Sequence, residues 1–484
     1  MNPIRKLAGQ TAIYGLPTIV GRLLNYLLVP LYTAYLPTED YGVVSELYAV
    51  VAFLIVLLTF GMETAFFRYF NLKEDKESVF RTSFLTVIGI NSLFFLVILF
   101  TNKQIADVML LRGHSEYIVL LSAVVCIDAI SAVPMAKLRS KNQALRFSGI
   151  HFSAIGVNIL LNLIFMIFLL DPERPEEGVL FILIANLLSS MVKIVGTAKD
   201  FLNLKFVIDF ALSKEMLLYS LPLVIGGFAG IINETLDRVI LKHTLFNRGG
   251  MTLVEAESQL GIYSANYKLA MLITIFLQAY RYAAEPFFFA NASVEDRRKL
   301  YGKIMNYFVA AVLFMFLFVA LNVDVFKYFI RNEAYWEGLK VVPILLLANV
   351  FLGIYFNQSI WYKLSNQTKF GAYIAIGGAS ITILINVIFI PAYGYMASAW
   401  ATLIVYALQM IASYYLGQKY YPIHYNLRKF FLYLILALVI FFVTKLIGIS
   451  PDTFSWTKMV VHNLMIGLFL FVVYTIEKPS FRRN

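Results

Sequence analysis

The spacing of apolar residues constrains this chain more than any other feature. Fourteen stretches rich in apolar residues follow one another between Gln10 and Ile476, and most loops between them are short. A bilayer core of about 30 Å requires ~20 apolar residues for each helix that crosses it. The chain of 484 residues is 60% hydrophobic and only 14% charged, whereas a soluble protein of this length carries far more charge. The sequence therefore predicts an all-α integral membrane protein.

The predicted spans can be placed from hydropathy alone. They cover residues 10–36, 42–70, 79–101, 116–137, 147–170, 178–197, 214–243, 259–289, 299–321, 337–363, 369–390, 394–418, 428–448 and 458–476. An even number of spans puts both termini on one side of the membrane. Most of the forty Lys and Arg then fall in loops on that side, as the positive-inside rule requires of the cytoplasmic face. We therefore expect both termini in the cytoplasm.

Composition also excludes several functional classes. The net charge of +11 reflects topology, so it does not indicate nucleic-acid binding. Cys126 is the only cysteine, and the five His are scattered without ligand spacing, so we expect no disulfide, no metal site and no cofactor. The sequence has no GxxxxGK[ST] phosphate-binding loop and no loop long enough for a catalytic domain. Transport is therefore favoured over an enzymatic activity.

The two halves of the chain resemble each other. Tyr14–Pro17 (YGLP) is echoed by Tyr219–Pro222 (YSLP), and Gly156–Phe165 (GVNILLNLIF) by Ser380–Phe389 (SITILINVIF). The second pair aligns Asn162 with Asn386. Two matches in the same order predict two pseudo-symmetric six-helix lobes, residues 1–213 and 214–427, followed by two further helices and a tail in 428–484. A substrate route would then lie between the lobes, near the midplane.

Four segments resemble a known family. They are LPTIVGRLLNYLLVPLYTAYLPTEDYG (Leu16–Gly42), SLPLVIGGFAGIINETLDRVIL (Ser220–Leu241), LGIYSANYKLA (Leu260–Ala270) and LINVIFIPAYGYMASAWATL (Leu384–Leu403). They are similar to polysaccharide (oligosaccharide and O-antigen) flippases of the multidrug/oligosaccharidyl-lipid/polysaccharide (MOP) exporter superfamily. The resemblance implies a MOP/MATE-like fold of fourteen helices. It also implies transfer of an undecaprenyl-diphosphate-linked oligosaccharide from the inner to the outer leaflet of a bacterial inner (plasma) membrane.

Charged residues inside the spans are the candidate site residues, because an uncompensated charge at the bilayer centre costs at least ~2.5–3.5 kcal/mol. Such cations could attract a diphosphate headgroup in a low-dielectric cavity. The candidates for the diphosphate and sugars are Arg22, Asn25, Lys268, Arg281 and Arg238, with Lys340 expected at the interface. The alternatives are an ion pair of Arg22 with Glu46 or Glu63, an intrahelical pair of Arg238 with Glu234, and an interfacial position for Arg281.

Carboxylates inside the spans form a second set. They are Glu46, Glu63, Asp128, Glu234 and Asp237, of which Asp128 and Glu46 are the strongest candidates. A carboxylate near mid-membrane can carry a proton or bind Na⁺, so it could couple transport to an ion gradient. It could equally compensate the charge of Arg22 or Lys268, and the sequence leaves both roles open.

Three other functions are weighed against a flippase for oligosaccharides. A drug or metabolite exporter of the same superfamily would favour an anionic aromatic cavity, and a lipid II flippase would use the same fold. A membrane-embedded transferase or polymerase would need acids or bases near the external surface, where Asp237, Glu255 and Glu257 are the candidates. The expected partners are the lipid-linked oligosaccharide and membrane lipids, and we expect a monomer.

Overall fold

The computed structural model describes residues 20–481 except 22, 25, 291–296 and 447–454. All regular structure in these residues is helical, and thirteen helices are long and apolar enough to cross a membrane. They correspond to the second through the fourteenth predicted spans, so the all-α membrane fold is confirmed. The first predicted span, 10–36, lies largely outside the described residues, which show its end as α2 (Val29–Tyr35).

The chain divides into two compact units, Met1–Gly261 and Ile262–Asn484. The helices of the first unit are α2, α3 (Thr38–Thr59), α4 (Met62–Leu72), α5 (Lys76–Val108), α6 (Ser115–Ser140), α7 (Ala144–Ile164), the π-helical turn η1 (Phe165–Leu169), α8 (Glu177–Thr197), the short η2 (Ala198–Asp200) and α9 (Phe210–Arg248). Helix α10 (Leu253–Ala290) begins in the first unit and continues into the second.

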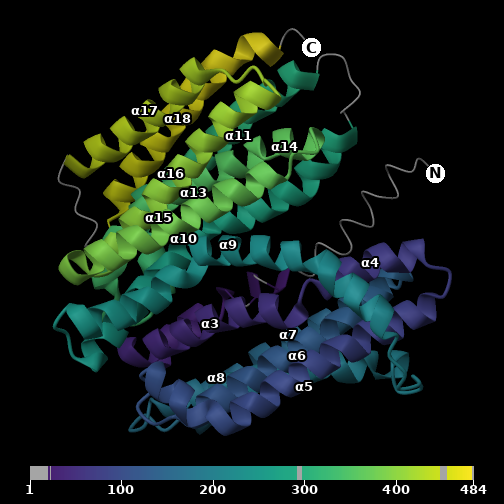
Figure 1. The fold of residues 1–484 in the computed structure, drawn as a ribbon. Coiled ribbons are helices and arrows are strands. Elements are labelled where there is room, and N and C mark those ends of the chain that lie inside the picture. The colour runs from purple at the N-terminus through teal and green to yellow at the C-terminus, as the bar shows by residue number, and fades with distance from the viewer. Residues whose placement is uncertain (1–19, 22, 25, 291–296, 447–454, 482–484) are drawn as a thin grey trace. The chain divides into compact units, whose positions relative to one another are not determined.

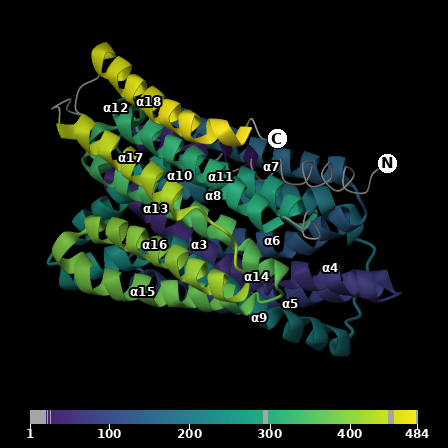
Figure 2. The same ribbon diagram turned by 90° about the horizontal axis from the view of Figure 1, so that it is seen from above.

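The second unit contains the remaining helices. They are α11 (Arg297–Leu321), α12 (Val323–Phe326), η3 (Lys327–Phe329), η4 (Glu333–Val341), α13 (Val342–Gln358), α14 (Ile360–Leu364), α15 (Lys369–Tyr393), α16 (Tyr395–Tyr420), α17 (Leu427–Leu446) and α18 (Trp456–Phe481). In Figure 2, α15 and α16 run side by side, and they pack against each other along their length. Helices α17 and α18 pack on α11.

The unit boundary at Gly261 differs from the predicted lobe boundary at 213. The difference arises because α9 packs against α3, α4 and α5, so packing joins it to the helices that precede it. The lobes were inferred from sequence repetition, which follows the order of helices rather than their packing. The division into 1–213, 214–427 and 428–484 therefore stays a prediction.

The packing within the two units repeats in the way a duplication requires. Helix α8 packs against both α6 and α7, and α16 packs against both α13 and α15. The two aligned asparagines are fully buried, Asn162 on α7 and Asn386 on α15. Each side-chain oxygen accepts a hydrogen bond from a neighbouring hydroxyl, Tyr32 in one unit and Ser398 in the other. The matched residues thus fix neighbouring segments in both units.

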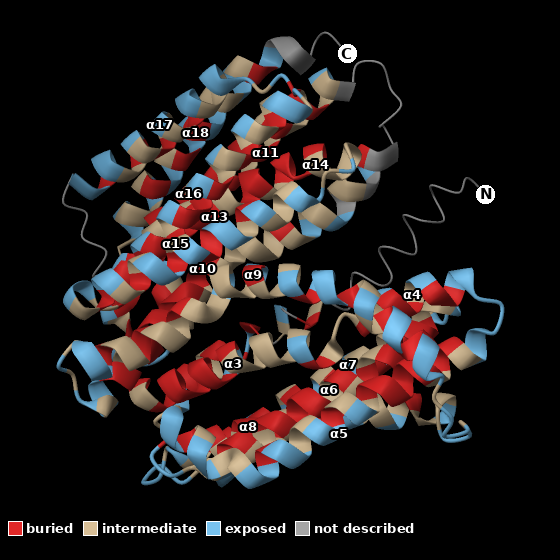
Figure 3. Cartoon of the chain, viewed as in Figure 1, coloured by how far each residue is buried: buried red, intermediate tan, exposed pale blue. Residues whose placement is uncertain are grey.

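Helix ends and lipid-facing surfaces follow from the sequence. Asp75 and Asp209 accept hydrogen bonds from the first-turn amides of Ser78 and Leu212, which caps α5 and α9 at their N-termini. Figure 3 shows buried residues on the inward faces of the helices and exposed ones on the outward faces. Large apolar side chains such as Phe100 and Phe168 are exposed there. In a membrane, these faces contact lipid instead of water.

The second predicted span contains a break that hydropathy does not reveal. Helix α3 ends at Thr59 and α4 begins at Met62, and the two residues between them, Phe60 and Gly61, have left-handed backbone angles, with φ of 49° and 63°. The buried side chain of Asn91 on α5 donates a hydrogen bond of 3.1 Å to the carbonyl oxygen of Leu58. An interrupted helix at membrane depth is tolerated where the freed backbone groups find partners, and Asn91 supplies one here.

We expect Gly61→Ala to destabilise the protein. Alanine at position 61 would have to adopt the left-handed backbone conformation, at a cost of about 1–2 kcal/mol. Its Cβ would lie 3.1 Å from Cβ of Ser220. The measurement is the thermal unfolding midpoint of the purified protein in detergent. Gly89→Ala is the control, since that helical glycine on α5 has open space around it and should tolerate alanine. Equal midpoints for the two variants would contradict a constrained break.

Candidate functional site

A polar pocket lies inside the first unit. It has a volume of about 310 Å³ and is walled by α3, α6, α7 and α8, together with Gly21. Its polar lining residues are Tyr48, Asp128, His151, Asn158, Asn186, Ser189, Ser190 and Lys193. Asp128 is at the middle of α6 and Asn158 near the middle of the span formed by α7 and η1. The pocket thus gathers polar side chains near the middle of two membrane-spanning segments.

The charged centre of this pocket is one ion pair. The ammonium of Lys193 on α8 lies 2.8 Å from Oδ1 of Asp128 on α6, and both side chains are about one quarter exposed, 22% and 28%. His151 lines the same pocket from α7. The pair leaves the second carboxylate oxygen and the further ammonium protons able to bind other groups, while the charges of the two residues cancel.

A chain of hydrogen bonds between side chains supports the pocket wall. Asn158 donates to Asn186 at 3.0 Å, and Asn186 donates to the hydroxyl of Tyr48 at 2.8 Å. Asn162, the repeat-matched residue, donates to the backbone oxygen of Asn158 and accepts from Tyr32. These bonds link α2, α3, α7 and α8, so the polar groups of the pocket are held in fixed positions.

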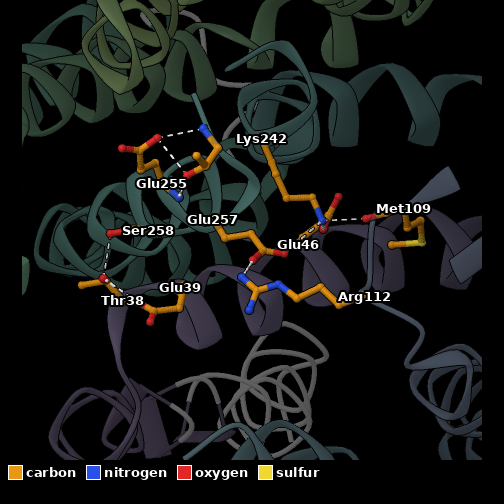
Figure 4. Close-up of polar contacts among 10 residues, drawn as sticks. Thr38, Glu39, Glu46, Met109, Arg112, Lys242, Glu255, Glu257 and Ser258 are labelled. Atoms are coloured by element: carbon orange, nitrogen blue, oxygen red, sulfur yellow. Dashed lines mark hydrogen bonds and ion pairs between the residues drawn. The ribbon is translucent and has the colours of Figure 1, made fainter. Parts of the chain in front are cut away.

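A second polar centre of the first unit is fully buried. Figure 4 shows Lys242 of α9 between Glu46 of α3 and Glu257 of α10. All three side chains are inaccessible to solvent, and Lys242 also donates a 2.6 Å hydrogen bond to the carbonyl oxygen of Met109. Glu257 is paired with Arg112, and the carboxylate of Glu46 accepts a hydrogen bond of 3.1 Å from Nε2 of His243. We call Glu46, Lys242 and Glu257 the buried charge cluster, and Arg112, whose side chain is 39% exposed, pairs with Glu257 at its edge.

Close backbone packing accompanies the buried charge cluster. A Cβ on Gly42 of α3 would overlap the carbonyl oxygen of Glu257, and a Cβ on Gly261 would overlap that of Thr38. Next to this contact, the hydroxyls of Thr38 and Ser258 are 2.7 Å apart (Figure 4). Glycine at both positions therefore lets α3 and the start of α10 touch, and the cluster ties α9 to the same contact.

The candidate cations are found in different surroundings. Arg22 and Asn25 lie outside the described residues. Arg281 of α10 stacks over the ring of Phe356 with 4.4 Å between guanidinium carbon and ring centroid, and its Nε is 3.8 Å from Glu285. Glu285 is also 2.5 Å from Lys363. Lys268 is half-buried on α10, and Lys340 pairs at 3.3 Å with the exposed Glu337.

The remaining candidates of the first unit have mainly local partners. Glu63 of α4 pairs with Arg139 of α6. Arg238 donates to the backbone oxygen of Glu234 at 3.4 Å, and the Glu234 side chain is exposed. Asp237 is buried on α9. Among the described residues, no group of three or more His, Cys, Asp or Glu is arranged to hold a metal ion.

Two functional candidates were missed by the sequence reasoning. That reasoning placed five Lys and Arg inside the spans, but Lys193 and Lys242 also fall inside the predicted spans 178–197 and 214–243. Both lie in the last third of a span, where a lysine often extends to the interface. Their position within the predicted limits was the available signal. The structure pairs Glu46 with Lys242, and Glu63 with Arg139.

Comparison with known proteins places the chain in a family. The model of the family described as "Polysaccharide biosynthesis protein" matches residues 7–292, more than half of the chain. This chain belongs to that family. An uncharacterized membrane protein of Haemophilus influenzae is 21% identical over 288 residues, which are 58% of this chain and 65% of the relative. A protein of the Lsg locus in the same organism is 21% identical over 366 residues, covering 72% and 82%.

Solved structures share the fold of this polysaccharide biosynthesis protein. A structure titled "Lipid II flippase MurJ, inward closed conformation" matches with a TM-score of 0.69 at 16% identity, covering 96% of this chain and 98% of the other. An inward-facing MATE multidrug resistance transporter of the MOP superfamily matches with a TM-score of 0.66 at 18% identity, covering 84% and 97%. The predicted MOP/MATE-like fold is therefore confirmed.

We expect Lys242→Met to destabilise the protein strongly. Removing the ammonium leaves the carboxylates of Glu46 and Glu257 buried near each other without their shared partner, at a cost of about 3–5 kcal/mol. Lys340→Met is the matched control, because its pair with Glu337 is exposed and contributes at most about 1 kcal/mol. Thermal unfolding midpoints in detergent compare the two. A Lys242→Met midpoint as high as that of the control would show that the cluster is not a structural centre.

Proposed function

We propose that this protein moves a polyprenyl-diphosphate-linked oligosaccharide from the cytoplasmic to the external leaflet of a bacterial inner membrane. The observation that carries the proposal is the polar pocket at mid-membrane depth in the first unit. A protein that only anchors or scaffolds has no need for such a pocket, because polar groups at this depth are costly. Membership of a polysaccharide biosynthesis family supports a saccharide cargo.

The mechanism is alternating access. The polar headgroup enters a hydrophilic route while the polyprenyl tail stays in lipid, and rearrangement of the helices then exposes the headgroup to the other side. The cations Arg22, Lys268 and Arg281, with Arg238 and Asn25, are proposed to attract the diphosphate. Positive-inside topology puts both termini in the cytoplasm, which puts the N-terminus of α3 and the α9–α10 connection on the external side.

The contact between α3 and α10 is proposed to be the external closure. Gly42 and Gly261 bring the two helices together, and the buried charge cluster holds α9 against them. Glycines at a helix contact let the two backbones approach closely. Opening to the external leaflet would part Thr38 from Ser258.

The competing functions fit the described residues less well. An exporter of organic cations needs an uncompensated carboxylate, but Asp128 is paired with Lys193. A transferase needs accessible acids or bases, but Glu257 is buried against Arg112 and Lys242, and Glu255 caps the start of α10 by accepting hydrogen bonds from Thr252. Pairing with lysine favours charge compensation over ion coupling for Asp128 and Glu46.

We expect lipid-linked oligosaccharide to accumulate on the cytoplasmic leaflet of a strain that lacks this gene. Arg22→Ala should fail to relieve the accumulation if this arginine binds the diphosphate, whereas Arg174→Ala, a change in an exposed pair with Glu177, should relieve it. The measurement is the amount and leaflet sidedness of the lipid-linked pool. An unchanged pool combined with new sensitivity to cationic dyes would instead indicate a drug exporter.

We expect a disulfide between positions 38 and 258 to stop transport. The hydroxyls of Thr38 and Ser258 are close enough that cysteines at both positions should bridge, and replacing the single native Cys126 by serine removes other thiols. Oxidation should abolish translocation in proteoliposomes, and a reducing agent should restore it. Each single-cysteine variant serves as the control. Full translocation by the cross-linked protein would exclude this contact as the external closure.

A further inference from the structure

The side chains that line the pocket of the first unit limit the kinds of ligand that it can bind. Among the described residues that line it, the charged ones are Asp128 and Lys193, which neutralise each other, and a third titratable residue is His151. Its other polar groups are amides and hydroxyls, which are matched to neutral hydrogen-bonding ligands. A strongly cationic or anionic ligand would have to disrupt the 2.8 Å ion pair to gain a counter-charge.

These groups can make the hydrogen bonds and the ring contact by which proteins bind a sugar ring. The Asp128 carboxylate keeps acceptor positions beyond its bond to Lys193, and the ammonium keeps two further protons, so together they can accept from and donate to adjacent hydroxyls. The Tyr48 side chain is 39% exposed and also lines the pocket. An aromatic ring offers a face on which the C–H groups of a pyranose can pack.

The size and rigidity of the pocket set a limit on the ligand. A volume of about 310 Å³ is at the lower end of the ~300–1,000 Å³ typical of ligand pockets, so it suits one or two sugar rings. The hydrogen-bond chain from Tyr32 through Asn162, Asn158 and Asn186 to Tyr48 fixes the wall. Preorganised polar groups of this kind lower the cost of ordering a ligand.

We propose that this pocket is a saccharide subsite that binds one or two uncharged sugar rings of the translocated headgroup. The assignment rests on the proposed flippase function and adds a substrate class to it. Asp128 and Lys193 bind ring hydroxyls, and Tyr48 packs against the ring. The diphosphate is bound elsewhere, because the described lining of this pocket offers no net positive charge.

Saturation-transfer NMR on the full-length protein in detergent tests the assignment. The probes are the uncharged sugars glucose, galactose and N-acetylglucosamine, compared with glucuronate and glucosamine. We expect saturation transfer to the uncharged sugars only. Asp128→Asn and Tyr48→Ala should weaken their binding about tenfold or more, and Tyr48→Phe should keep most of it. Glu337→Gln, a change in an ion pair outside the pocket, should leave binding unchanged.

A charge exchange separates ligand binding from a purely structural ion pair. Asp128→Lys combined with Lys193→Asp rebuilds the pair with reversed ends, so the thermal unfolding midpoint should recover while sugar binding should not. Sugar binding that recovers fully in the exchanged variant would overturn the assignment. So would stronger binding of a charged sugar, no binding of any sugar by the unmodified protein, or unchanged binding by Asp128→Asn.

Failure of the saccharide-subsite proposal can be distinguished from failure of the flippase proposal. Unchanged sugar binding in Asp128→Asn, together with cytoplasmic accumulation in the strain lacking the gene, removes the subsite and keeps the flippase. Sugar binding that depends on Asp128 and Tyr48, without such accumulation, keeps a saccharide site and removes the flippase.

Discussion

Polar groups inside a bilayer must find their partners within the protein, because the hydrocarbon offers none. The organisation of the first unit follows from this constraint. Lys242 has no solvent exposure, and it is stabilised by Glu46, Glu257 and the carbonyl oxygen of Met109. Glu257 in turn is paired with Arg112. Residues from three helices and one connection are thus fixed by one group of charges, and loss of Lys242 would leave two buried carboxylates without their shared cation.

The same constraint explains why the polar pocket indicates a function. Each amide of its wall is paired with another side chain or with the backbone, from Tyr32 to Tyr48. In a purely structural network, every polar side chain would have its hydrogen bonds satisfied within the protein. Here Asp128, Lys193 and Tyr48 remain partly exposed, so they have binding capacity beyond their internal bonds. Capacity for hydrogen bonds at membrane depth is what a transporter of a polar headgroup requires.

Much of the fold could be predicted from the sequence because a membrane span has a simple one-dimensional signal. The predicted span 178–197 and the observed α8, Glu177–Thr197, agree within one residue. The break at Phe60–Gly61 has no such signal, since it depends on Asn91 of α5 and on the space beside Ser220 of α9. The pairing of charges was equally hidden. Glu46 and Lys242 are far apart in the sequence, so only tertiary packing shows that they meet.

Translocation by the purified protein tests the central claim most directly. Proteoliposomes would contain a fluorescent polyprenyl-diphosphate disaccharide in both leaflets, and a membrane-impermeant quencher would report how much of it is outside. The account predicts that vesicles with the protein expose the inner-leaflet share to the quencher over time, while protein-free vesicles do not. Inner-leaflet label that stays protected in both kinds of vesicle would contradict a flippase for lipid-linked saccharides.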